Sequence, residues 1–350
     1  MKKRILALLA AMAMSLSLVA CGAKTETPAP STPDAPAPEA PAGTETVKII
    51  CGYGVGGTAD LVARTFAQSA NKLQTKYNFI VENMTGGDGF AAATYFADLP
   101  TDAKELLVFG YGLIYRHDLG KTYGTEIVEF DRLDMHPIGT VDDRTWILYA
   151  APGTTLEDVL AKAKDGSLKM SGGNPLSDCH LELGSLAGLM GGKVMVVPYD
   201  GGAAQKKGLM DGEVDVFMGT TQAGVEEVEA GTLVPILAFS DRAFEGFKTP
   251  EGPITVPTVA GDAKAPELPA DIDFTSCILP AGGTLGCRAG APQEFVDDMT
   301  QIIKDVWNDA DFHGWVESVM LNRFELYNED AQKFMDDACA KAIAAFGNLS

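Results

Sequence analysis

The chain has 350 residues, enough for about two or three domains of ordinary size. Hydrophobic residues make up 46% and charged residues 21%, near the globular average, which excludes a disordered or fibrous chain. Acidic residues outnumber basic ones by 48 to 27, and the formal charge is −21. This balance argues against a nucleic-acid-binding protein, because phosphate contacts need a basic surface.

The first twenty residues have the features of a secretory signal. Lys2, Lys3 and Arg4 precede an apolar stretch, Ile5 to Ala20, that as a helix would rise about 24 Å, short of a ~30 Å hydrocarbon core. A signal at residues 1–20 is therefore favoured over a membrane span. The stretch ends in Leu-Val-Ala-Cys-Gly and resembles the bacterial lipobox, which implies a lipidated Cys21. The alternative is an ordinary signal cut nearby, with Cys21 incidental.

Residues 21–45 are rich in proline and alanine and have no hydrophobic period. Six of the 19 prolines lie in this segment, which favours an extended, stiff tether. Loss of residues 1–20 would leave 24 basic and 48 acidic residues, a charge of −24. We therefore expect an extracytoplasmic protein held at the membrane by Cys21, in the periplasm or on the outer face of the cell.

Five further cysteines follow the tether. An odd number leaves at least one thiol free unless two chains pair. Cys277 and Cys287 flank a glycine-rich loop, and export would permit a disulfide between them. The alternative is that all five are small buried residues. Four histidines and no suitable spacing of His, Cys and Asp predict no metal site.

From Val47 onward the chain repeats a unit of strand, glycine-rich turn and helix. This alternation is typical of mainly parallel sheets with helices on both faces. The pattern predicts strands at 47–50, 78–82, 106–109, 168–170, 194–197, 214–217 and 233–239, and turns that open helices at 52–57, 83–89, 171–177, 198–202 and 219–221. The carboxyl-terminal part is predicted to be helical at 292–308, 312–320 and 329–346.

Two sheet regions are visible. We assign residues 45–144 and 240–350 to a first lobe and 145–239 to a second. The reason is that segment 240–290 is rich in Pro and Gly and could carry the chain from the second lobe back to the first. Two α/β lobes joined by crossing strands leave a cleft, a common place for a small ligand.

Each glycine-rich turn joins the end of a strand to the start of a helix. The first amides of a helix have no helical partner, and its dipole adds about half a positive charge. Glycine lets a ligand approach those amides closely. The turns therefore predict an anion site that needs no Lys or Arg. Such a site is compatible with a charge of −24, because distant acids are screened within about 10 Å at 0.1 M salt.

Two patterns point to other functions but have little support. Residues 52–57 fit G-x-G-x-x-G, with Glu82 where a ribose-binding acid would lie, yet nicotinamide cofactors are scarce outside the cytoplasm. Ser177 and His180 are neighbours, but no G-x-S-x-G elbow surrounds them. Ser177 is better explained as a helix N-cap. We expect a protein that is not an enzyme and holds no cofactor.

At its turns the sequence resembles the substrate-binding proteins of tripartite tricarboxylate transporters, also called Bug receptors. Those proteins have a first pattern near V-P-F-x-x-G-G-x-x-D, and residues 50–60 here read Ile-Cys-Gly-Tyr-Gly-Val-Gly-Gly-Thr-Ala-Asp. Their second pattern is near N-x-P-G-A-G-G, and residues 83–89 here read Asn-Met-Thr-Gly-Gly-Asp-Gly. Further likenesses lie at 170–181, 197–203, 212–215, 229–240 and 256–259. The likeness runs from about Val47 to Phe346.

The resemblance implies a two-lobed, Venus-flytrap fold of the periplasmic-binding-protein type II kind. It also implies a monomeric receptor for a small carboxylate, such as a di- or tricarboxylate, that delivers its ligand to membrane permease subunits. The first lobe's loops would contribute Tyr53, Gly56, Gly57, Thr58, Asp60, Gly86, Gly87 and Asp88, and the second lobe Ser171, Ser177, His180, Tyr199, Gly202 and Thr220. Tyr53 and Tyr199 would wall the cleft unless they are ordinary packing aromatics, and Asp60 fits a helix start better than a ligand contact.

The sequence departs from the family pattern at Asp88, which replaces a glycine of the second clamp loop. If Asp88 points inward, it would repel a carboxylate and favour an amino group, so that an acidic amino acid becomes a plausible ligand. We favour the outward orientation, which says nothing about specificity. Lys206 and Lys207 also stand where apolar residues are common. The alternatives to transport are a sensor that uses the same fold and, with less support, an exported enzyme.

Overall fold

The structure is a computed structural model that describes residues 44–123, 131–173, 176–199 and 201–349. The predicted signal, Cys21 and nearly all of the predicted tether lie outside the described residues. The strands are β1 (Glu45–Cys51), β2 (Tyr77–Asn83), β3 (Glu105–Gly110), β4 (Met135–Asp143), β5 (Trp146–Ala150), β6 (Lys169–Gly172), β7 (Met195–Pro198), β8 (Val216–Thr220), β9 (Val234–Ala238), β10 (Phe244–Thr249), β11 (Gly252–Val256) and β12 (Gly282–Arg288). The helices are α2 (Thr58–Leu73), α3 (Phe90–Ala97), α4 (Tyr111–Tyr123), α5 (Leu156–Asp165), α6 (Asp178–Leu189), α7 (Gly202–Met210), α8 (Thr221–Glu229), α9 (Gln293–Trp307), α10 (Ala310–Ser318) and α11 (Glu329–Phe346), with short 3₁₀ turns at Gly87–Gly89, Arg132–Asp134 and Thr275–Cys277.

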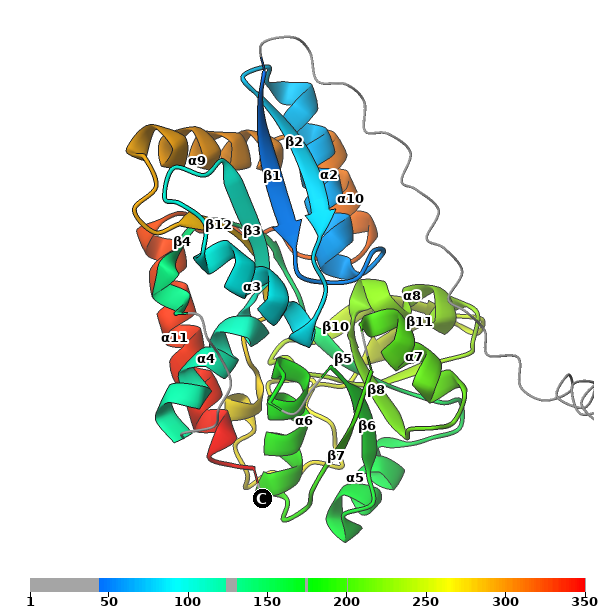
Figure 1. The fold of residues 1–350 in the computed structure, drawn as a ribbon. Helices are drawn as coiled ribbons and strands as arrows, with labels where there is room; N and C mark the ends of the chain where they lie inside the picture. The colour runs from blue at the N-terminus through cyan, green and yellow to red at the C-terminus, as the bar shows by residue number, and fades with distance from the viewer. Residues whose placement is uncertain (1–43, 124–130, 174–175, 200, 350) are drawn as a thin grey trace, which may run out of the picture. The chain divides into compact units, whose positions relative to one another are not determined.

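The first sheet has the order β2-β1-β3-β12-β4. Strand β1 pairs in parallel with β2 and β3, whereas β12 runs antiparallel to both β3 and β4. Helices α2, α9 and α10 cover one face, where Phe66, Trp307 and Phe312 are buried in a common core (Figure 1). Helices α3, α4 and α11 supply most of the core of the other face.

The second sheet has the order β7-β6-β8-β5-β9. Strands β6, β7 and β8 are parallel, and β5 is antiparallel to β8 and β9. Helices α5 and α6 contribute to the core of one face, and α7, α8 and the β10–β11 hairpin to the core of the other. In each sheet four strands therefore run in one direction, and only the strand that enters from the other lobe, β12 or β5, runs against them, so both sheets are mainly parallel, as predicted.

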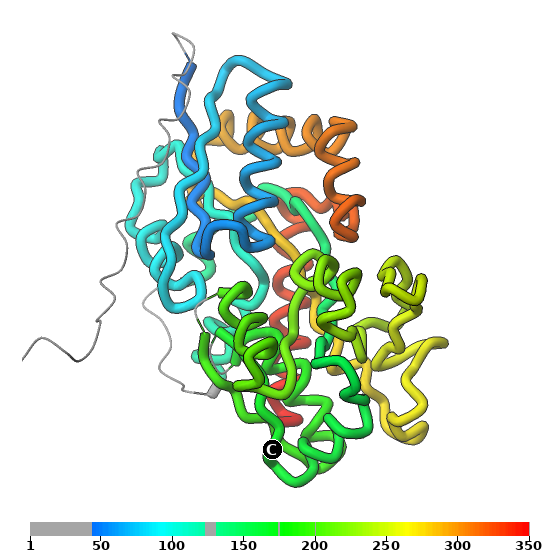
Figure 2. Tube along the Cα trace, turned by 90° about the vertical axis from the view of Figure 1, so that its right-hand side faces the viewer, coloured from blue at the N-terminus to red at the C-terminus, as the bar shows by residue number. Residues whose placement is uncertain are grey.

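The segment after β9 packs with the second lobe, which differs from its expected place in the first. Phe247 and Val256 are buried with residues of β5 and β8, and Val259 and Phe274 with the opposite core of the second sheet. The chain re-enters the first sheet only at β12. Beyond α11 it ends beside the second lobe, where the Asn348 amide donates to Ser185 (Figure 2).

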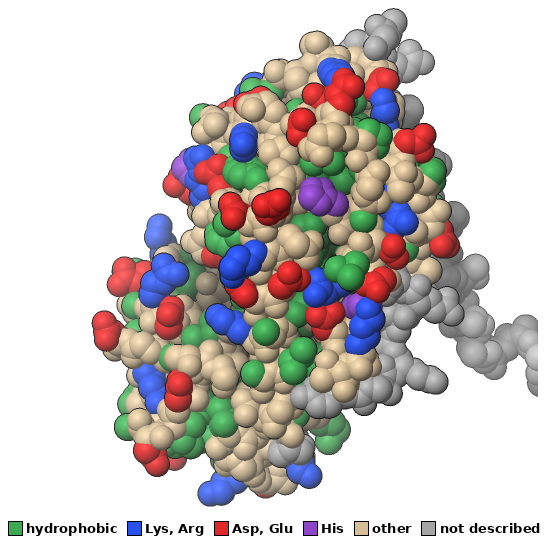
Figure 3. Space-filling view, turned by 90° about the vertical axis from the view of Figure 1, so that its left-hand side faces the viewer, with side chains coloured by type: hydrophobic (Ala, Val, Ile, Leu, Met, Phe, Trp, Pro, Cys, Tyr) green, Lys and Arg blue, Asp and Glu red, His purple; other side chains and the backbone are tan. Residues whose placement is uncertain are grey.

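The predicted disulfide between Cys277 and Cys287 is wrong. Cys277 is buried in the core of the second lobe and Cys287 in that of the first, and all five described cysteines are free thiols. Acidic and basic side chains are interspersed over the face shown in Figure 3. Within the described ranges, no helix has the length and apolar character needed to cross a membrane.

Candidate functional site

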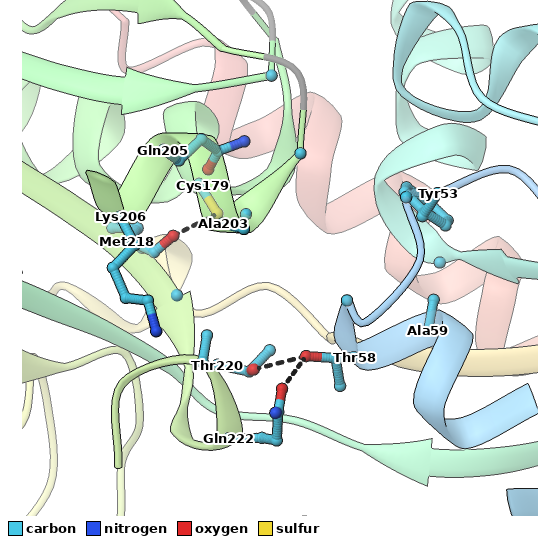
Figure 4. A pocket seen from close by; sticks show the side chains of 18 of the residues that line it. Tyr53, Thr58, Ala59, Cys179, Ala203, Gln205, Lys206, Met218, Thr220 and Gln222 are labelled. Carbon is cyan, nitrogen blue, oxygen red and sulfur yellow. Dashed lines mark hydrogen bonds between the residues drawn. The ribbon is translucent and has the colours of Figure 1, made fainter. Parts of the chain in front are cut away.

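A cavity of about 380 Å³ lies between the two lobes. The loop after β1 and the start of α2 line it from the first lobe, and the starts of α6, α7 and α8 line it from the second (Figure 4). Eight of the residues predicted for the site line this cavity: Tyr53, Gly56, Gly57, Thr58, Asp88, Ser177, Gly202 and Thr220.

Four helices begin at the cavity wall. Thr58 opens α2 and Asp178 opens α6, while Gly202 opens α7 and Thr220 is the N-cap of α8. In α2 the first helical amide bond runs from Leu61 to Gly57, so the amides of residues 58–60 have no helical partner, whereas those of Gly56 and Gly57 donate to Asp60 and to the Gly54 carbonyl. The arrangement brings the positive ends of four helix dipoles toward one small volume.

Asp60 holds the first loop in place and does not line the cavity. Its buried carboxylate accepts hydrogen bonds from the Gly56 amide (2.9 Å), from Arg64 (3.0 Å) and from the Asn83 side chain (2.7 Å). Asn83 also donates to the Tyr53 carbonyl (3.0 Å), which ties the end of β2 to the loop. Asp60 thus positions the loop, as its place at the helix start suggests.

Two threonines connect the lobes at the cavity. The Thr58 hydroxyl lies 3.0 Å from that of Thr220 and 3.0 Å from Oε1 of Gln222, as the dashed lines in Figure 4 show. Thr58 has one hydroxyl hydrogen, which it donates to Gln222, so Thr220 is the donor in the other bond. The lobes therefore touch through a directed chain from Thr220 to Thr58 to Gln222.

The second predicted clamp loop lines the cavity through Asp88 and not through Gly86 or Gly87. Gly86 and Gly87 lie away from the lining, and the loop's carbonyls face the buried guanidinium of Arg116 instead. Arg116 donates to the Asp88 carbonyl (2.7 Å) and to the Gly87 carbonyl (3.4 Å), and its guanidinium stacks 4.1 Å from the centre of the Phe90 ring. Gly86 and Gly87 are therefore predicted ligand contacts that do not line this cavity.

Asp88 lines the cavity, so the favoured outward orientation is wrong. Its backbone has a left-handed conformation, with φ of 58°. Its carboxylate lies 3.6 Å from the Arg116 guanidinium and reaches the second lobe, where a Cβ at Gly173 would stand 3.0 Å from its Cγ. The left-handed turn aims the side chain across the cleft.

Three of the site residues predicted in the second lobe, Ser171, His180 and Tyr199, do not line the cavity. Ser171 is buried, and its hydroxyl has no hydrogen-bond partner among the described residues. His180 accepts the Leu176 amide (3.0 Å), and burial lowers the pKa of its imidazole. Tyr199 donates to Glu213 (2.6 Å) and packs against Gly208 of α7, as an ordinary aromatic does. Ser177 is the expected N-cap, and its hydroxyl accepts the His180 amide (3.4 Å).

The charged lining residues other than Asp88 were not predicted. Arg144, between β4 and β5, is paired with the buried carboxylate of Asp142. Lys206 of α7 is paired with Glu227 (2.6 Å). Burial, and after it the charge of Asp88, raise the pKa of the Asp178 carboxyl to about 6. The sequence marked Lys206 as a departure from the family pattern, but Arg144 lies in no motif, and Asp178 stands at an unspecified position of the likeness at 170–181.

Comparisons with known proteins support the fold. No protein-family model matches the chain. A protein of Cupriavidus necator, the UPF0065 protein in the gbd 5' region, is 26% identical over 206 residues, which are 57% of this chain and 61% of that protein. The structure of R. palustris Rpa4515 with adipate has a TM-score of 0.71 at 18% identity, covering 87% of this chain and 97% of that one.

Two further solved structures have a similar fold. MatC from Rhodopseudomonas palustris with bound malate has a TM-score of 0.69 at 18% identity, over 86% of this chain and 98% of that one. The periplasmic binding protein BugD also has a TM-score of 0.69 at 18% identity, over 87% and 97%. The chain has the two-lobed α/β fold of the type II periplasmic binding proteins, as its sequence predicts.

Proposed function

We propose that the protein is an extracytoplasmic solute-binding receptor of the Bug family. It takes a small carboxylate into the cavity between its lobes and delivers it to the permease subunits of a tripartite tricarboxylate-type transporter. The fold and the loop motifs support this proposal, as do the adipate and malate named with two of the similar structures. Its ligand is a small organic acid.

The convergence of four helix starts on one cavity carries the proposal. One helix start contributes about 0.3–1 kcal/mol toward an anion when exposed and up to ~2 when partly buried. Hydrogen bonds to a charged group add about 1.5–3 kcal/mol each. Micromolar affinity needs about −8 kcal/mol, which one turn cannot supply but several acting on one ligand can.

The lining residues favour binding over catalysis. Cys179 is the strongest nucleophile of the lining, and burial raises the pKa of its thiol well above the usual value. His180, the nearest imidazole in sequence, does not line the cavity. A buried neutral thiol in a described lining that contains no imidazole suits a wall and not a reaction centre.

Calorimetry on the full chain tests the binding. Succinate, malate, glutarate, adipate and citrate are titrated beside the matching amino acids, and mass spectrometry identifies what co-purifies. One saturable site per chain at micromolar affinity is the expected result. Absence of binding by every acid in the panel would overturn the proposal.

Anchoring and delivery need separate experiments. The Cys21→Ser chain is expected to be released from the membrane fraction, whereas a matched Ser31→Ala chain in the tether stays bound. Delivery predicts that uptake of the ligand into cells requires both this protein and the permease subunits. Uptake unchanged without this protein would leave a sensor as the better function.

A further inference from the structure

Two carboxylates from opposite lobes, those of Asp88 and Asp178, line the same cavity. Asp88 of the first lobe reaches Gly173 of the second, where a Cβ would lie 3.0 Å from its Cγ. Asp178 of the second lobe reaches Gly112 of the first, where a Cβ would lie 3.1 Å from its Cγ. Both contacts depend on glycine in the opposite lobe. Each carboxylate therefore reaches the opposite lobe at a position where glycine leaves room for it.

The charge of Asp178 has no partner of opposite sign. Its carboxylate accepts the amide of Cys179 (3.0 Å), but no ion pair joins it to a cation among the described residues. Asp88 has Arg116 at 3.6 Å, and Arg144 and Lys206 are engaged by Asp142 and Glu227. Asp178 is half-buried and lines the cavity, so its charge favours a cation supplied from there.

Four helix starts at the same cavity favour an acidic group on the ligand. Thr58, Asp178, Gly202 and Thr220 stand at these starts and line the cavity. The indole of Trp146 also lines it, but its Nε1 is buried and has no surface on the cavity, so the indole is part of the wall. The acidic group and the cation would therefore belong to the same ligand.

We propose that the ligand is an amino-carboxylate whose ammonium group lies between Asp178 and Asp88 while its carboxylate is held by the helix starts. This inference rests on the proposed function and narrows its substrate class. A plain dicarboxylate would satisfy the amides but would leave Asp178 without a counter-charge and facing like charge.

Matched ligands that differ by one amino group test the inference in the full chain. Aspartate is titrated against succinate, glutamate against glutarate, and 2-aminoadipate against adipate. We expect at least one amino member to bind ten times more tightly than its plain counterpart. Asp178→Asn should abolish this preference and leave the plain acid bound as tightly or more tightly, whereas Asp102→Asn, which removes an exposed carboxylate, should change neither.

Asp88→Asn provides a second variant should Asp178→Asn fail to fold, because asparagine tolerates the left-handed backbone. It should reduce the preference for the amino member. Plain acids that bind as tightly as their amino counterparts would overturn the inference and leave the proposed function standing. A preference that survives both variants would also overturn it. Failure of every acid to bind would remove the proposed function and the inference together.

Discussion

The hydroxyl oxygens of Thr58 and Thr220 lie 3.0 Å apart, although the two residues belong to different lobes and are 162 positions apart in the chain. Both were predicted as ligand contacts, and both line the cavity. The structure gives them an additional role, because their hydrogen bond joins the lobes directly and continues to Gln222.

Thr58→Val should weaken this connection without changing the size of the side chain. A neutral hydrogen bond contributes about 0.5–1.5 kcal/mol, so we expect ligand affinity to fall roughly threefold to tenfold. Small-angle scattering of the unliganded chain should show a larger radius of gyration. Thr255→Val, on the exposed side of β11, is the control. Unchanged affinity and scattering would mean that the hydrogen bond does not hold the lobes together.

Gly57→Asp should separate binding from stability. Gly57 is the N-cap of α2 with an extended backbone, a position that aspartate fills well, so stability should change by less than about 1 kcal/mol. The new carboxylate would occupy the helix amides and repel an acid, so affinity should fall at least tenfold. Gly314→Asp adds the same charge on α10, facing open space, and should leave affinity intact. Equal affinities of the two variants in calorimetry would exclude the first turn from the site.

Asp178 should make the fold less stable as pH rises. Its folded-state pKa of about 6 lies above the ordinary 3.8, because burial and the charge of Asp88 outweigh Arg116 and Arg144. Near pH 4 the carboxyl is largely protonated in the folded chain, but above pH 6 the folded chain must hold a charge that the unfolded chain solvates. Asp178→Asn should therefore raise the free energy of unfolding by about 1–3 kcal/mol at pH 8 and by little at pH 4. Denaturant titrations that show no gain at pH 8 would refute this assignment.

The buried cysteines should all remain reduced. Alkylation of the unfolded, unreduced chain, followed by peptide mass mapping, should modify Cys51, Cys179, Cys277, Cys287 and Cys339. The native chain should react slowly, because all five side chains are buried. Protection of Cys277 and Cys287 in the unfolded chain would reveal a disulfide that the two separate cores do not accommodate.

The repeated units of the fold were predictable because each carries its own signal. The strands at 47–50, 78–82 and 214–217 lie within or overlap β1, β2 and β8, and glycine turns precede the helices that follow. Strands β4, β5 and β12 were missed, since each crosses or returns between lobes and has neighbours distant in sequence. Helix α4 was missed as well, because it follows β3 directly, without a glycine-rich turn.

The cavity lining was predictable where the wall is formed by the turn itself, as at Gly56, Gly57 and Gly202. It was not predictable where a partner from elsewhere redirects a loop. Arg116, on the missed helix α4, binds the carbonyls of the second loop and lies beside the Asp88 carboxylate. No local pattern contains that interaction, so neither the position of Gly87 nor that of Asp88 could be inferred from residues 83–89 alone.

The first crossing between the sheets is only two residues long, Arg144 and Thr145. If the lobes part, backbone torsions there and at the return before β12 must absorb the rotation, which makes this joint a hinge. The Arg144 guanidinium is fastened to Asp142 at the end of β4, so it travels with the first lobe. An incoming solute would then contact Arg144 at the hinge first and Asp178 of α6 only when the lobes close. Discrimination between ligands would therefore occur at closure and not at first contact.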